Sequence, residues 1–183
     1  MNTAKKLMLL TIGGVAVYYL VQNQGNPTTA WQALSSDVTA ALNGWKAAGS
    51  GPQWVPVLNA YEAQYGLPAD LLAATAYQES SFIENVIRGI TPSSDGLSLG
   101  IMQLQTQFYP ALVGPSVPVP YSDAAVTAQI AQAAQVFASN YRALGSWPAA
   151  VAAWNQGLSG VQSNGITSVA YVNDIIANAP AAA

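Results

Sequence analysis

The sequence predicts a mainly α-helical protein, with a single helical domain at 53–178 behind an N-terminal helix. Its 183 residues are enough for one domain of ordinary size with short appendages. Apolar residues recur at helical spacing along most of the chain, and strand-like alternation is nearly absent outside 97–104. Glycine and proline separate the helical segments, and 179–183 form an alanine-rich tail.

The composition excludes several kinds of chemistry. The chain has five lysines and arginines and a net charge of -3, which argues against a nucleic-acid partner. It contains no histidine and no cysteine, so imidazole bases, thiol nucleophiles, disulfides and the usual zinc ligand sets are excluded. Acid–base chemistry is left to carboxylates, tyrosine or lysine. We expect neither a metal nor an organic cofactor.

Residues 1–22 are predicted to anchor the chain in a membrane. Lys5 and Lys6 precede an uncharged run at 7–21, LMLLTIGGVAVYYLV. As a helix this run would be about 22 Å long, shorter than the roughly 30 Å core of a bilayer, and flanking polar and tyrosine side chains would close part of the gap. A cleaved signal sequence and a buried helix are the alternatives. With an anchor, the positive-inside rule places the following domain on the non-cytoplasmic side.

Residues 23–52 are predicted to be a linker that contains an amphipathic helix at 31–46. The helix has an apolar stripe with Trp31 and Trp45 at its ends. This stripe either packs on the following domain or binds a membrane surface or a partner. Residues 48–52 have the sequence AGSGP, which is typical of a linker between two structured segments.

Inside the domain, helices are predicted by apolar periodicity and by their end signals. Gly66 is a suitable C-cap for the first helix, and Pro68 is placed at the start of the second. A turn is predicted at 93–96 and a proline-punctuated loop at 110–120. The predicted helices cover 55–65, 67–81, 124–144, 147–154 and 167–177.

Glu79 is the residue that most clearly indicates chemistry. It shares a helical face with Leu72, Thr75 and Ala76, so its carboxylate is predicted to point inward or into a cleft. Its place in the last helical turn and its desolvation both raise the pKa of a carboxyl group. A carboxyl that stays protonated near neutral pH suits a general acid in glycosidic cleavage. On helix geometry alone, a Glu that snorkels or caps a loop is the alternative.

Three sequence blocks resemble soluble-type (Slt-like) lytic transglycosylases, in the order found in that family. Residues 65–82, YGLPADLLAATAYQESSF, resemble its catalytic helix with the Glu-Ser pair. Residues 100–104, GIMQL, resemble its G-L-M-Q-L/I segment, and residues 145–157, GSWPAAVAAWNQG, resemble its G-S-W-x-x-A-L-A-A-Y-N-A-G block. The resemblance covers about 53–161 and implies a mainly α, lysozyme-like α+β fold.

The resemblance also implies an activity and a set of site residues. The activity is cleavage of the β-1,4 bond between N-acetylmuramic acid and N-acetylglucosamine in peptidoglycan glycan strands, with Glu79 as the sole acid and base and a 1,6-anhydro product. The substrate-binding residues implied in the same way are Ser80, Ser94 (or Ser93), Gly100, Met102, Gln103, Trp154 and Asn155.

Three departures from the family pattern bear on activity, two at single residues and one in a spacing. Trp154 stands where the family has Tyr, so a hydroxyl contact near the acid is expected to be lost. Gln105 stands where the family has Met, and an insertion at 87–94 lengthens the stretch from Glu79 to Gly100. These departures keep a non-catalytic peptidoglycan-binding or scaffold protein as an alternative.

Asp95 keeps a second alternative open. Goose-type lysozymes, which share the fold, place an acidic residue in this region to position hydrolytic water, so Asp95 is a candidate second carboxylate. In a Ser-Ser-Asp-Gly turn it is also a turn former. For either chemistry, the anchor and the small size suggest local opening of the cell wall by a membrane-anchored component of a phage virion or a secretion complex.

Overall fold

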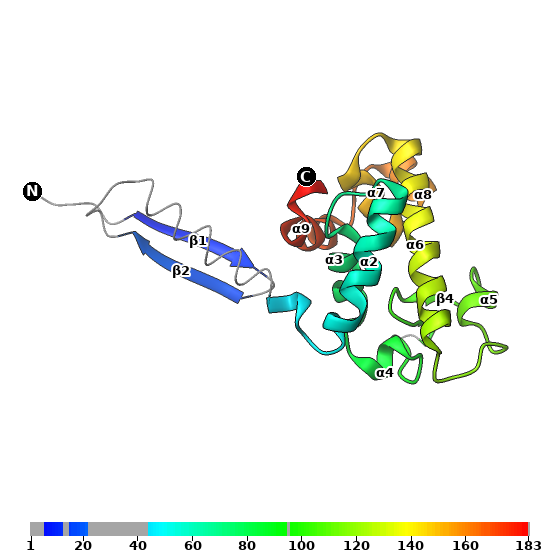
Figure 1. Cartoon of the computed structure of the whole chain (residues 1–183). Coiled ribbons are helices and arrows are strands. Elements are labelled where there is room, and N and C mark those ends of the chain that lie inside the picture. The colour runs from blue at the N-terminus through cyan, green and yellow to red at the C-terminus, as the bar shows by residue number, and fades with distance from the viewer. Residues whose placement is uncertain (1–5, 13–14, 22–43, 95, 183) are drawn as a thin grey trace, which may run out of the picture. The chain divides into compact units, whose positions relative to one another are not determined.

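The protein divides into two compact units, Met1–Gly44 and Trp45–Ala183. The second unit is helical and holds the whole of the predicted domain. It is shown with the first unit in Figure 1, coloured along the chain. The computed structural model describes residues 6–12, 15–21, 44–94 and 96–182.

In the first unit, the described residues form a β-hairpin. Strand β1 (Lys6–Ile12) pairs antiparallel with β2 (Val15–Val21), residue by residue along the full length of both strands. The helix predicted over 7–21 is therefore wrong. β-Branched and tyrosine residues favour strands, and Gly13 and Gly14, near the middle of the run, would each weaken a helix by about 1 kcal/mol relative to alanine. In the parts of the chain with described positions, no helix is both long enough and apolar enough to cross a membrane.

Most of the predicted amphipathic helix at 31–46 lies outside the described residues. Its last residues, 44–46, are helical. Trp45 is buried and stacks on Phe82, with ring centroids 6.2 Å apart and 12° between the planes. Because Trp45 packs in this way, the C-terminal end of the predicted stripe covers the domain that follows it.

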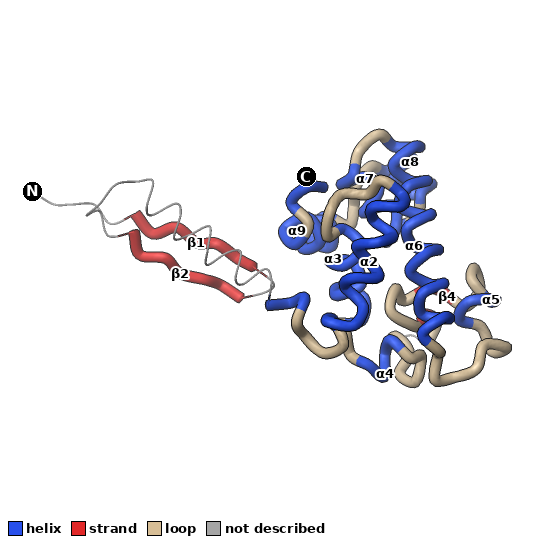
Figure 2. The backbone as a smooth tube through the Cα atoms, in the orientation of Figure 1, coloured by secondary structure: helices blue, strands red, loops and turns tan. Residues whose placement is uncertain are grey.

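The second unit is built mainly from helices, and longer loops flank the short helix at 110–113, as the tube in Figure 2 shows. The main helices agree with the predicted ones, with ends shifted by a few residues. A two-stranded antiparallel ribbon over 98–105 overlaps the stretch at 97–104 where strand-like alternation was predicted. The elements are α2 (Gly51–Tyr65), α3 (Leu71–Ser80), α4 (Glu84–Ile87), β3 (Ser98–Leu99), β4 (Leu104–Gln105), α5 (Pro110–Val113), α6 (Asp123–Leu144), α7 (Trp147–Gln156), α8 (Leu158–Asn164), α9 (Val169–Asn178) and a 3-10 turn (Pro180–Ala182).

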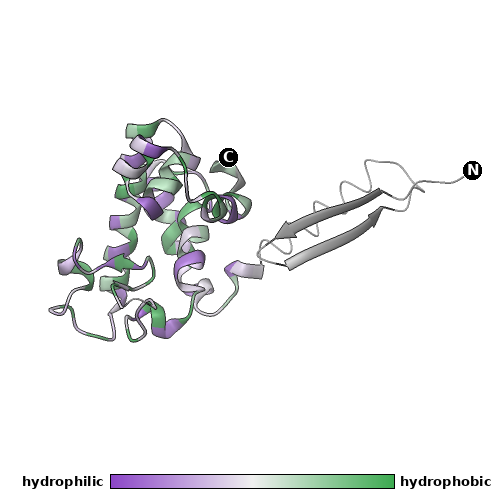
Figure 3. Cartoon of the chain, turned by 180° about the vertical axis from the view of Figure 1, so that it is seen from behind, coloured by the Kyte–Doolittle hydropathy of each residue, from purple (hydrophilic) through white to green (hydrophobic). Residues whose placement is uncertain are grey.

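Helix α6 is the packing centre of this unit. It contacts α2, α3, α5 and α7, while α9 packs against α3 and α7. Val126, Ile130, Ala133 and Phe137 on α6 are fully buried, at the spacing of one helical face. Burying each large apolar side chain contributes roughly 1.5–3 kcal/mol. Figure 3 shows hydrophobic residues in green and hydrophilic residues in purple along the helices of this unit.

The segment predicted as a linker at 48–52 is part of this packing. Helix α2 begins at Gly51, and the backbone N–H of Ser50 donates to the Phe82 carbonyl at 2.8 Å. A Cβ on Gly49 would lie 2.3 Å from the same carbonyl oxygen, so only glycine allows this approach. The contact joins the start of α2 to the turn that follows α3.

The start of α3 is capped by a buried carboxylate from α2. Glu62 is 3% exposed and accepts hydrogen bonds from the backbone N–H groups of Asp70, Leu72 and Ala73 at 2.7–3.2 Å. The helix begins at Leu71, four residues after the start of the helix predicted over 67–81. Burial raises the pKa of Glu62, although the backbone donors oppose that shift. The cap holds α3 at the end opposite to Glu79.

Candidate active site

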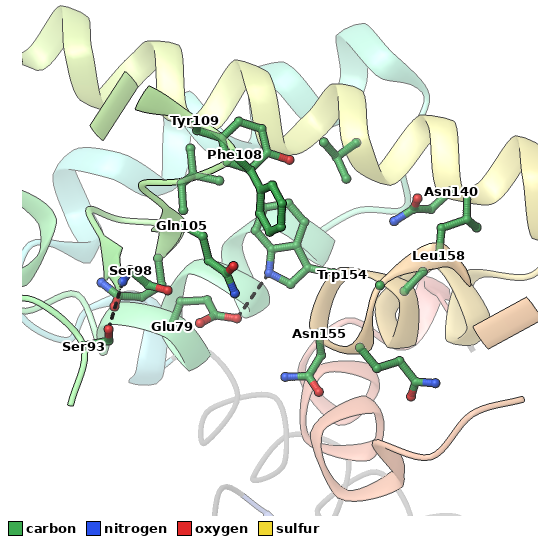
Figure 4. A pocket seen from close by; sticks show the side chains of 16 residues that line it. Glu79, Ser93, Ser98, Gln105, Phe108, Tyr109, Asn140, Trp154, Asn155 and Leu158 are labelled. Atoms are coloured by element: carbon green, nitrogen blue, oxygen red, sulfur yellow. Dashed lines mark hydrogen bonds between the residues drawn. The ribbon is translucent and has the colours of Figure 1, made fainter. Parts of the chain in front are cut away.

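Glu79 lies in the last turn of α3, where donors from two other helices meet it. Trp154 of α7 donates its Nε1–H to Glu79 Oε1 at 3.2 Å, a contact drawn in Figure 4. Tyr171 of α9 donates its hydroxyl to the same oxygen at 2.5 Å. Since α9 packs on both α3 and α7, the carboxylate sits where three helices converge.

The surroundings of Glu79 favour its protonated form. Burial raises the pKa of Glu79 above its ordinary value, and the hydrogen bonds from Tyr171 and Trp154 oppose the rise without cancelling it. The C-terminal end of the helix dipole acts in the same direction as burial. Burial and the Glu79 carboxylate in turn raise the pKa of Tyr171, so its hydroxyl keeps its proton and remains a donor.

A cavity of about 800 Å³ opens beside Glu79. Its walls come from the β3–β4 ribbon, the residues just before α5, and helices α6, α7 and α8. Five of the lining side chains are amides that can both donate and accept hydrogen bonds. They are Gln103, Gln105, Asn140, Asn155 and Gln156, several of which Figure 4 shows around Glu79 and Trp154.

Among the described residues that line this cleft, Glu79 is the only acidic one. Glu84 is the first residue of α4 and is not part of the cleft lining. Its carboxylate accepts a hydrogen bond from the Ser50 hydroxyl and forms a salt bridge with Arg88 at 2.7 Å. Asp95, the candidate second carboxylate, lies outside the described residues. The described part of the cleft therefore offers one carboxyl group for acid and base chemistry.

A family model for the transglycosylase SLT domain matches residues 56–170. The chain belongs to this family. Its members are peptidoglycan lytic transglycosylases, which are glycan-cleaving lyases, and this SLT protein is an enzyme of that class. Neither curated proteins nor solved structures gave a significant match to the chain.

Several site residues that the sequence predicted in the SLT domain line the cleft. Besides Glu79, these are Gln103, Trp154 and Asn155. Of the two serines weighed for one position, Ser93 lines the cleft, whereas Ser94 is exposed and is not part of the lining.

The other predicted site residues lie behind the cleft wall. Met102 is fully buried, and Ser80 donates its hydroxyl to the Ala76 carbonyl at 2.7 Å within α3. Gly100 has a φ of 82°, and a Cβ there would lie 2.0 Å from the Gln129 side chain. These three residues shape the wall through packing and backbone geometry instead of contacting the cavity.

Trp154 has a different part in the site from the one expected. The ring of Phe137 stacks on it, with centroids 5.0 Å apart and 13° between planes, so a protein ring covers one face of the indole. Its Nε1–H contacts Glu79. Trp154 therefore replaces the expected tyrosine hydroxyl with an indole donor, and less of its surface is available to a sugar ring.

Tyr171 was missed by sequence reasoning. It lies in the predicted helix at 167–177, and no local motif distinguishes it from the other tyrosines. The one available signal was its spacing of four residues from the buried Ile175, which places both on the inner face of α9. The hydroxyl group expected to be lost at Trp154 is supplied here, from a different helix.

Proposed function

We propose that this SLT enzyme cleaves the β-1,4 bond between N-acetylmuramic acid and N-acetylglucosamine, with Glu79 as the only acid and base. The observation that supports this most is the placement of Glu79, a partly buried carboxyl with a raised pKa beside a cleft whose other described lining residues include no acid. Both described donors bind Oε1, so we assign proton transfer to Oε2.

In the first step, protonated Glu79 gives its proton to the bridging oxygen as the bond from that oxygen to C1 of the muramic acid residue breaks. The carbonyl oxygen of the substrate's own N-acetyl group bonds to C1 in its place. Tyr171 and Trp154 stabilise the carboxylate that remains, because both donate hydrogen bonds to it.

In the second step, the Glu79 carboxylate takes the proton from the C6 hydroxyl of the same sugar. O6 then bonds to C1, and the bond from C1 to the N-acetyl oxygen breaks. The product is a 1,6-anhydro ring, Glu79 is protonated again, and no water is consumed. One carboxyl group is enough for both steps, in contrast to the pair that most glycosidases use.

Mass spectrometry of the fragments released from peptidoglycan tests this proposal. Purified full-length protein should release muropeptides with 1,6-anhydro ends, which are lighter by one water than the reducing ends left by hydrolysis. Reducing ends would instead support hydrolysis assisted by Asp95. Binding without release would contradict the catalytic proposal and favour a peptidoglycan-binding scaffold.

Two matched variants assign the acid. Glu79→Gln should abolish release while the circular dichroism spectrum stays that of the wild type, because the amide cannot transfer the proton. Glu84→Gln, on an exposed glutamate five residues later, should remain active. An active Glu79→Gln variant would refute the mechanism.

We further propose that the enzyme acts outside the cytoplasmic membrane, where peptidoglycan lies, and opens the wall locally for a virion or secretion complex. The substrate class supports the location, and the single small catalytic unit supports the limited opening. Protease protection in intact cells tests the location. Immunodetection in purified particles or secretion complexes tests the context.

A further inference from the structure

We infer that Gln156 is a positioning residue that holds the start of α9 and thereby keeps the Tyr171 hydroxyl on Glu79. This inference rests on the proposed role of Glu79. Gln156 is the last residue of α7 and lies two residues after Trp154. The same short segment of α7 would then control both donors to the carboxylate.

The side chain of Gln156 forms hydrogen bonds to the connection between α8 and α9. Its Oε1 lies 3.0 Å from the backbone nitrogen and 3.0 Å from the hydroxyl oxygen of both Thr167 and Ser168. Its Nε2 donates to the Gly165 carbonyl at 2.8 Å. One amide group therefore fixes three of the four residues from 165 to 168.

These contacts lie close to the donor that meets Glu79. Ser168 is the N-cap residue of α9, and Tyr171 follows it within one helical turn. Backbone N–H groups at the start of a helix have no partner inside the helix. Because Gln156 supplies an acceptor for the N–H groups just before α9, it determines where the first turn of that helix begins, and therefore where the Tyr171 hydroxyl lies.

The contacts are specific to the residue found here. In the family block that residues 145–157 resemble, the matching position is alanine, which has no group to accept or donate these bonds. The neighbouring departure, Trp154, changes the other donor to Glu79. We infer that the two departures act together, one supplying a donor directly and the other fixing the second donor in place.

Kinetics with full-length variants on soluble glycan strands test this inference. Gln156→Ala should lower kcat by about tenfold, within the range that a slightly misplaced catalytic group causes, while KM changes less than twofold. Removal of the Tyr171 hydrogen bond raises the pKa of Glu79, so the alkaline limb of the pH–rate profile should move to higher pH in both Gln156→Ala and Tyr171→Phe. The double variant should match Tyr171→Phe alone.

A control variant and a milder variant distinguish a positioning role of Gln156 from a general loss of folding. Gln162→Ala, on an exposed glutamine of the adjacent α8, should behave as the wild type in kcat and pH profile. Ser168→Ala removes one of the hydroxyl contacts but keeps the backbone, and should shift the same limb in the same direction by less. If Gln156→Ala fails to fold, an unshifted Ser168→Ala profile overturns the inference.

The outcomes distinguish this inference from the proposed function. An active Glu79→Gln variant would refute the proposed function itself. If Glu79→Gln is inactive and Tyr171→Phe is shifted, an unshifted Gln156→Ala profile would overturn the positioning role alone. So would additive effects in the double variant, because additivity means that the two residues act independently.

Discussion

The Tyr171 hydroxyl donates a hydrogen bond to Glu79 Oε1 at 2.5 Å, although the two residues are 92 positions apart in the chain. The bond joins α9 to the end of α3. It stabilises the charged form of a carboxyl group whose burial favours the neutral form. In the mechanism proposed above, the balance of these two effects sets the pH range in which Glu79 acts first as an acid and then as a base.

Removing this hydroxyl should therefore move the pH dependence of the enzyme. In Tyr171→Phe the carboxylate loses a donor, the pKa of Glu79 rises further, and the limb where activity falls with rising pH should shift to higher pH. We expect kcat to fall by about tenfold, since the carboxyl is also less well held. A pH–rate profile measures both effects, with Tyr65→Phe on α2 as control. An unshifted limb would show that the bond does not influence the acid.

Glu79 should also make stability depend on pH. Its pKa in the folded protein is raised above the value in the unfolded chain, so its contribution is fully present below the unfolded pKa and is lost as pH rises through the folded pKa. Urea unfolding from pH 4.5 upward should show a smaller loss of stability in Glu79→Gln than in the wild type. Some dependence should remain, because the pKa of Glu62 is also raised. Parallel curves would contradict the prediction.

A side chain at position 100 should destabilise the protein. Both Gly100 and Gly96 have positive φ angles, of 82° and 71°, but a Cβ on Gly100 would also lie 2.0 Å from Gln129 Oε1, whereas Gly96 has open space around it. We expect Gly100→Ala to lower the free energy of unfolding by about 2 kcal/mol or more and Gly96→Ala by about 1 kcal/mol, the cost of positive φ alone. Equal losses in chemical denaturation would mean that the contact with Gln129 relaxes freely.

Phe108 should bind the glycan through its ring. It lines the cleft with its side chain 68% exposed, so its loss should change binding much more than folding. Stacking of an aromatic ring on a sugar contributes about 1 kcal/mol or slightly more to binding. We therefore expect Phe108→Ala to raise the KM for soluble glycan strands by about tenfold. Phe108→Tyr should retain the wild-type KM. A wild-type KM in Phe108→Ala would exclude a binding role.

Local sequence predicted the direction of a side chain correctly where that direction depends on one face of one helix. The face that Glu79 shares with Leu72, Thr75 and Ala76 predicted its inward direction and raised pKa, and the structure agrees on both. Local sequence failed at 7–21, where a run of apolar residues was interpreted as a helix although Gly13 and Gly14 interrupt it. Apolar runs do not by themselves distinguish helix from strand.

The amino-acid sequence alone was enough to infer the helical architecture, the family and the candidate acid, because each of these inferences depends on residues near one another in the chain. Folding in three dimensions decided which groups surround that acid. Tyr171 reaches Glu79 only because α9 packs on α3 and α7, and Ser93 instead of Ser94 lines the cavity because of the conformation of one loop. Contacts between distant segments depend on packing and on backbone direction, which periodicity does not encode.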